Sequence, residues 1–122
     1  MPFDANVVYR LVDEVPAGEA ASYGMIASLL PGVTARMVGR ALGHLPNGAT
    51  TPWHRIVNAT GAIAPRPSAA GQRKLLLAEG VSFRKNGFVD WSRHRWRGPS
   101  PRWFDETGAD IESITEIIAG WR

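Results

Sequence analysis

The segment SYGMIASLLPGVTARMVGRALGHL, residues 22–45, predicts two short helices joined by a tight turn. Ser22 is a suitable N-cap for the first helix, which the Pro-Gly pair at 31–32 ends. Thr34 can cap the second helix, whose apolar positions 37, 38, 41, 42 and 45 form one stripe. Arg36 and Arg40 fall outside this stripe and are expected to face solvent. The pattern predicts a helix-turn-helix with exposed arginines, although an ordinary helical hairpin would give the same pattern.

The residues on both sides of this segment also have a largely helical pattern. Apolar residues at helical spacing over 3–15 predict an amphipathic packing helix, and residues 46–67 lack periodicity and are expected to form a long loop. A further helix over 68–79 should end at Gly80, and Asn86-Gly87 predicts a β-hairpin within 81–90. We therefore expect a mainly α fold, a single winged helix-turn-helix-type domain over 1–98 with a long pocket loop and a minor hairpin.

The segment 99–122 is expected to be a short helical extension. Its isoleucines at 111, 114, 117 and 118 share one helical face with Trp121. This face can pack on the domain or bind a partner, and the pattern favours packing on the domain.

Composition and charge exclude some classes of protein and leave nucleic-acid binding open. The 122 residues suffice for one hydrophobic core, and the formal charge of +3 is compatible with nucleic-acid binding without establishing it. The chain contains no cysteine, which excludes disulfides and thiol nucleophiles within it. No apolar run reaches the roughly 18–20 residues of a membrane-spanning helix, and Asp4 and Asp13 argue against a secretory signal. A cytoplasmic protein is expected, associated with the nucleoid if it is bacterial.

One motif carries a specific resemblance. The stretch Thr51-Pro52-Trp53-His54-Arg55-Ile56-Val57 resembles the active-site signature of the O6-alkylguanine-DNA alkyltransferases, Pro-Cys-His-Arg-Val. Residues 21–23, 36–42 and 75–80 resemble further segments of that family, so the similarity covers residues 1 to about 97. Tryptophan stands where the alkyl-accepting cysteine belongs, which is typical of the alkyltransferase-like proteins.

The resemblance implies a pocket for a damaged guanine. A thiolate is a strong nucleophile and an indole is not, so Trp53 is expected to line the pocket without accepting the alkyl group. The expected pocket residues are Tyr23, Pro52, Trp53, Ile56, Val57 and Arg66. The backbone carbonyls of Trp53 and Ile56 are expected to accept from the guanine 2-amino group, and Arg66 to stack on the damaged base.

The resemblance also assigns roles around the pocket. Arg36 corresponds to the arginine that replaces the flipped base in the DNA stack, in a helix bound in the minor groove. Ser22, Thr34 and Arg40 are expected to contact the DNA backbone, and His54 and Glu79 to form a structural pair. Pro67 occupies the position whose backbone N–H stabilises guanine O6 in the alkyltransferases, and proline has no such donor.

The expected function is recognition of O6-alkylguanine in duplex DNA, with base flipping, without alkyl removal, and with hand-over to nucleotide excision repair. The resemblance implies no catalytic residue, cofactor, metal or membrane, and one flipped base needs only a monomer. Two alternatives remain open. A sequence-specific helix-turn-helix regulator would ignore O6 alkylation, and an enzyme using a His54-activated water would remove the lesion with turnover.

Overall fold

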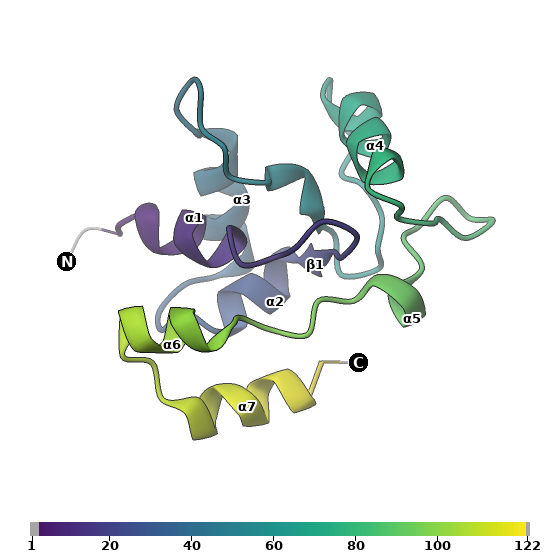
Figure 1. The fold of residues 1–122 in the computed structure, drawn as a ribbon. Helices are drawn as coiled ribbons and strands as arrows, with labels where there is room; N and C mark the ends of the chain where they lie inside the picture. Colours follow the sequence, from purple (N-terminus) through teal and green to yellow (C-terminus); the bar gives the residue numbers. More distant parts are fainter. Residues whose placement is uncertain (1–2, 122) are drawn as a thin grey trace.

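The computed structural model describes residues 3–121 and is mainly helical (Figure 1). Among these residues, no helix is long and apolar enough to cross a membrane. The elements follow one another along the chain as α1 (Asn6–Val12), β1 (Ala21–Ser22), α2 (Tyr23–Ser28), α3 (Ala35–Gly43), the 3-10 helix η1 (Trp53–Arg55), β2 (Ile56–Val57), α4 (Ala69–Ala78), α5 (Trp91–His94), α6 (Pro101–Thr107) and α7 (Ile111–Ala119).

The helix-turn-helix is formed by α2 and α3, and both predicted caps are present. The Ser22 hydroxyl accepts from the Met25 N–H at 3.0 Å, and the Thr34 hydroxyl accepts from the Met37 N–H at 3.2 Å. Both helices end two residues before the last apolar residue of their pattern, at Ser28 and Gly43. The buried face of α3 points toward α1 and α2, which leaves its arginines exposed.

A parallel pair of short strands, β1 and β2, was not predicted. Ala21 pairs with Ile56 and Ser22 with Val57, so the segment that begins α2 lies beside the segment that follows η1. The expected loop over 46–67 is therefore partly ordered, because it contains η1 and β2. This pairing positions the Pro-Trp-His-Arg segment next to the helix-turn-helix.

The predicted end of α4 and the predicted hairpin are both observed. Gly80 has φ +86°, and the N–H groups of Gly80 and Val81 donate to the carbonyls of Leu77 and Leu76, the pattern of a Schellman motif. In the hairpin, the Arg84 N–H donates to the Phe88 carbonyl at 2.8 Å, and Gly87 in the turn has φ +86°. A second, smaller apolar cluster lies between α4 and this hairpin and contains Ala20, Val57, Leu76, Val81 and Val89.

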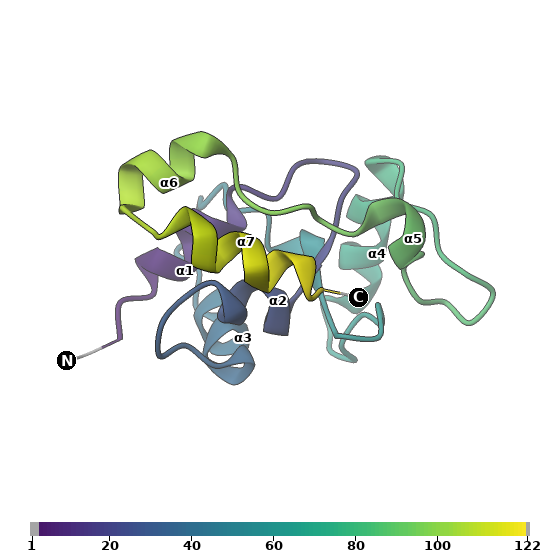
Figure 2. The same cartoon turned by 90° about the horizontal axis from the view of Figure 1, so that it is seen from below.

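The C-terminal extension forms α6 and α7 and packs against the main core. Figures 1 and 2 show both helices beneath α1 and α2, on the side away from α4. Trp103 of α6 and Ile114 of α7 are buried in the main cluster, and Trp121 stacks on Trp96 with ring centroids 5.6 Å apart. Pro101 begins α6, where its missing N–H leaves no helical hydrogen bond unmade. The sequence predicted helix in this region and favoured packing, but not two separate helices.

Polar contacts also join the extension to α1 and to the residues that follow it. Glu106 of α6 is paired with both Arg10 and Arg102, and the Glu14 carboxylate accepts from the Ser100 N–H at 2.7 Å. The hydrogen bond from Arg10 lowers the pKa of Glu106 below its ordinary value, and that from Arg102 acts in the same direction. These exposed contacts add little stability individually, so the buried aromatic and aliphatic residues hold the extension in place.

Two isoleucine-to-alanine substitutions on α7, one buried and one exposed, test this packing. Ile114→Ala should lower the free energy of unfolding by about 2–4 kcal/mol, because it removes buried methyl groups from the main core. Ile111→Ala is the matched control, since Ile111 is 61% exposed, and it should change stability by less than about 0.5 kcal/mol. Urea unfolding of both variants measures the difference, and equally small effects would contradict packing of α7 on the core.

Candidate nucleic-acid interface

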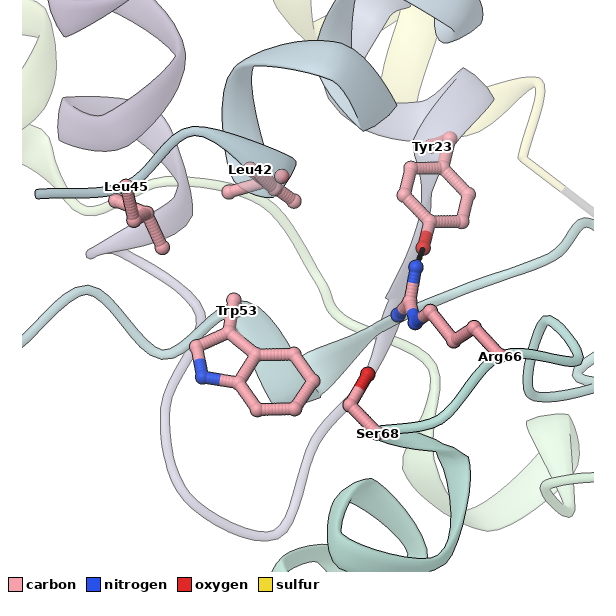
Figure 3. A pocket seen from close by; sticks show the side chains of 7 residues that line it. Tyr23, Leu42, Leu45, Trp53, Arg66 and Ser68 are labelled. Carbon is pink, nitrogen blue, oxygen red and sulfur yellow. Dashed lines mark hydrogen bonds between the residues drawn. The ribbon is translucent and has the colours of Figure 1, made fainter.

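A cavity lies between the end of α3, the start of α2, η1 and the loop that precedes α4. Its volume is about 380 Å³. The lining residues come from these four segments and are Tyr23, Leu42, Gly43, Leu45, Trp53, Arg66 and Ser68. Figure 3 shows Trp53 on one side and Tyr23 on the other, with Arg66 extending toward the Tyr23 hydroxyl. Three of the predicted pocket residues, Tyr23, Trp53 and Arg66, are thus brought together.

Arg66 contacts both aromatic residues of the cavity. Its guanidinium carbon lies 5.9 Å from the centroid of the Trp53 ring, within cation–π range. Its Nη1 donates to the Tyr23 hydroxyl at 3.4 Å, a long hydrogen bond. The cavity therefore presents two aromatic surfaces and one cation, a combination suited to a flat, electron-rich ring.

A buried glutamine holds Arg66 from behind. Arg66 Nη2 donates to Oε1 of Gln72 at 2.9 Å, and the Gln72 side chain of α4 is completely buried. Sequence reasoning missed Gln72. A signal was present, because glutamine occupies a position of α4 that lies one helical turn before the buried Leu76.

Glu79, at the end of α4, binds two residues of the Pro-Trp-His-Arg segment. Nε2 of His54 lies 3.0 Å from Oε2 of Glu79, so the contact predicted between them is present. Arg55 donates to both carboxylate oxygens, at 3.0 and 2.6 Å, and its Nη1 donates to the Val15 carbonyl at 2.8 Å. Arg55 thus joins η1 both to α4 and to the chain after α1.

This pairing changes the acidity of Glu79. The hydrogen bond from Arg55 lowers the pKa of Glu79 below its ordinary value of 4.5, partial burial opposes this change, and the hydrogen bond from His54 lowers the pKa further. The carboxylate is therefore held in its charged form.

The structure assigns different places to the other predicted pocket residues. Ile56 and Val57 are completely buried in the core and do not line the cavity, so their contact with a damaged base stays a prediction. The Ile56 carbonyl accepts from Gln72 Nε2 at 2.9 Å. Pro52 precedes η1 and also lies outside the cavity lining. Pro67 lies between the lining residues Arg66 and Ser68.

The residues predicted to contact DNA divide into two groups. Arg36, in the first turn of α3, is exposed, as are Arg40 and Thr34. Ser22 is buried, and its hydroxyl accepts the capping hydrogen bond of α2. In the structure Ser22 therefore serves as a helix cap, and its contact with the DNA backbone stays a prediction.

Comparison with known proteins identifies relatives of the whole region that contains the cavity. Residues 3–81 match the family model of the 6-O-methylguanine DNA methyltransferase DNA-binding domain. The DNA base-flipping protein of Escherichia coli (strain K12) is 43% identical over 91 residues, which cover 73% of this chain and 70% of that protein. Alkyltransferase-like protein 1 of Schizosaccharomyces pombe is 41% identical over 81 residues, which cover 62% of this chain and 74% of that protein.

Solved structures of the same kinds of protein also match this chain. The S. pombe alkyltransferase-like protein in complex with damaged DNA containing O6-carboxymethylguanine matches with a TM-score of 0.67 and 34% identity, covering 79% of this chain and 98% of that chain. Mycobacterium tuberculosis OGT in complex with DNA matches with a TM-score of 0.57 and 31% identity, covering 78% of this chain and 54% of that chain. The fold class predicted from the sequence is confirmed.

The Glu79 cluster predicts a specific dependence of stability on pH. Glu79→Gln should lower the free energy of unfolding at pH 7 by about 1–3 kcal/mol, because it leaves Arg55 without its carboxylate. The folded-state pKa of Glu79 is lowered, so its contribution is full above about pH 4.5 and is lost as the pH falls through the folded-state pKa. The difference between wild type and variant should therefore shrink below pH 4.5.

Thermal unfolding from pH 3 to 7 measures this difference. Glu116→Gln, which changes an exposed carboxylate on α7, is the matched control. If the difference in stability between wild type and Glu79→Gln stayed constant down to pH 3, the stabilising role of the charged Glu79 carboxylate would be contradicted.

Proposed function

The chain belongs to the alkyltransferase-like family, and from this membership we propose that it recognises O6-alkylguanine in duplex DNA without removing the alkyl group. The damaged base is flipped out of the helix and held in the cavity lined by Tyr23, Trp53 and Arg66. The observation that carries the proposal is this cavity, built around a tryptophan at the acceptor position, in a fold similar to a protein solved with O6-carboxymethylguanine DNA.

The chemistry of the cavity suits a flipped base. Its volume of about 380 Å³ lies within the roughly 300–1,000 Å³ of small-molecule sites. Aromatic side chains stack on bases, and the Arg66 guanidinium adds a cation–π contact worth about 0.5–2 kcal/mol. Such contacts depend on the ring of the base, so they tolerate different alkyl groups on O6.

The same residues argue against alkyl transfer. Alkyl transfer from guanine O6 requires a strong nucleophile, and the indole of Trp53 is a poor one. The chain contains no cysteine that could replace it. Pro67, between two lining residues, has no N–H to stabilise the departing guanine oxygen. A base held here stays alkylated, and the complex persists.

Base flipping is assigned to α3. Arg36 is exposed in its first turn, where a helix inserted in the minor groove would direct the side chain into the base stack. Flipping costs a few kcal/mol and is least costly at a weakened pair, as O6-alkylguanine forms. Arg40, also exposed, contacts the backbone and supplies affinity without selectivity.

A long-lived complex that bends DNA and does no chemistry can mark the lesion. We propose that the mark is read by nucleotide excision repair proteins and that one protein molecule is sufficient for each lesion. The exposed side of α6 and α7 is a candidate surface for this contact, because the other side is packed on the core.

The first test is a fluorescence-anisotropy titration with two duplexes that differ only in one guanine, O6-methylated or not, at a fixed salt concentration. Binding should be at least about tenfold tighter to the methylated duplex, because its weakened pair is easier to open. Mass spectrometry of the same samples should find both protein and DNA unchanged.

Other outcomes would identify the alternatives. Equal affinity for both duplexes would contradict lesion recognition and favour a sequence-specific regulator. Loss of the methyl group from DNA would contradict the non-catalytic assignment. Transfer to the protein would add a methyl group to its mass, whereas hydrolysis through a His54-activated water would leave the protein mass unchanged.

Arg36 and Arg40 provide a matched pair of substitutions on one helix. Arg36→Ala should abolish most of the preference for the methylated duplex, because no side chain then fills the gap left by the base. Arg40→Ala should weaken binding to both duplexes equally and reduce the slope of log affinity against log salt by about 1. An unchanged preference in Arg36→Ala would contradict its role in flipping.

A further inference from the structure

Gln72 uses its whole amide to join the cavity to the protein interior. Its Oε1 accepts from Arg66 Nη2 at 2.9 Å. Its Nε2 donates to the carbonyls of His54 and Ile56, at 3.1 and 2.9 Å. The side chain is completely buried, so water does not compete for these hydrogen bonds. One residue thereby contacts the backbone on both sides of Arg55 and the cation of the cavity.

Packing alone does not explain a glutamine at this position. Burying an amide is unfavourable unless its hydrogen bonds are made, and an apolar side chain of similar size would fill the same volume without that cost. Leu76, one turn further along α4, is also completely buried and packs in the second apolar cluster. What Gln72 supplies and a leucine would not is a fixed acceptor for Arg66 and a fixed donor for two carbonyls.

Arg66 needs such an anchor, because it is exposed on a loop. Its backbone is already restricted, since Pro65 and Pro67 flank it and proline fixes φ. Its long side chain would otherwise sample many rotamers in solvent. The hydrogen bond to Gln72 limits these rotamers and holds the guanidinium 5.9 Å from the Trp53 ring centroid before any ligand enters.

The two carbonyls belong to the segment that carries Trp53. His54 lies in η1 directly after Trp53, and Ile56 begins β2. The Gln72 amide group contacts both this segment and Arg66, so it fixes the Arg66 side chain relative to the segment that carries Trp53.

We propose that Gln72 is a positioning residue that determines lesion selectivity by orienting Arg66 relative to Trp53. It does not touch the base. The preorganised Arg66 stacks on a flipped purine without losing further side-chain freedom, which strengthens binding of the flipped state over binding of an intact duplex. This inference rests on the proposed function, since it concerns the same cavity.

The experiment is a double-mutant cycle read by anisotropy with the O6-methylguanine and unmodified duplexes. Gln72→Met retains the length of the side chain and removes its hydrogen bonds. It should reduce the preference for the methylated duplex by roughly threefold to tenfold, within the range a cation–π contact supplies, with unmodified-duplex affinity unchanged. In an Arg66→Ala background, Gln72→Met should produce no further loss of preference.

Two further variants separate positioning from stability. Leu76→Val disturbs the other buried position of α4 without touching Arg66, and it should lower the melting temperature while leaving the preference intact. Arg66→Lys keeps the charge at an exposed site and so tests the proposal even if Gln72→Met does not fold. A lysine ammonium lacks the planar fork that spans Gln72 and Trp53, and the preference should fall by a similar factor.

The outcomes distinguish this inference from the proposed function. A wild-type protein that binds both duplexes equally would overturn the proposed function itself. A wild-type preference that survives Gln72→Met or Arg66→Lys would overturn only the role of Gln72. Equal losses from Gln72→Met with and without Arg66 would also overturn it, since the effect would then come from the fold.

Discussion

The ion pair between Arg55 and Glu79 joins η1 to the C-terminal end of α4, and the candidate site depends on this junction. The Pro-Trp-His-Arg segment lies in a region rich in glycine and proline that has no long strand or helix of its own. Its polar groups are satisfied by α4, through Glu79 at the end of the helix and Gln72 on its buried face. Because Arg55 also donates to the Val15 carbonyl, the same junction fixes the segment to the part of the chain that follows α1.

A site supported in this way is suited to recognition. The supporting contacts lie behind the cavity, whereas the lining offers aromatic surfaces and a cation without a strong nucleophile. The contact between His54 Nε2 and Glu79 Oε2, at 3.0 Å, joins η1 to the end of α4. Glu79 also accepts hydrogen bonds from Arg55, so its carboxylate has a structural role that does not require a catalytic reaction.

In the C-terminal extension, the sequence predicted helix but not its division into two helices. Its apolar stripe was visible in the sequence, and the preference for packing on the domain agrees with the burial of Trp103 and Ile114. The division into α6 and α7 depends on Gly108, which adopts φ +69° at the end of α6, and on Asp110, whose side chain caps α7. Both residues can be read in the sequence. That they separate two helices, each packed on the main core, is seen only in the tertiary structure.

The sequence by itself determined the local features: the caps of α2 and α3, the glycine that ends α4, the hairpin turn, and the tryptophan in place of a nucleophile. Each depends on residues within one or two turns of each other, where side-chain chemistry and backbone preference act directly. The tertiary structure alone decided the pairing of β1 with β2, the burial of Ile56 and Val57, and the contacts of Gln72. These features join residues that are distant in sequence, and whether a side chain faces a cavity or the core depends on which distant segment packs against it.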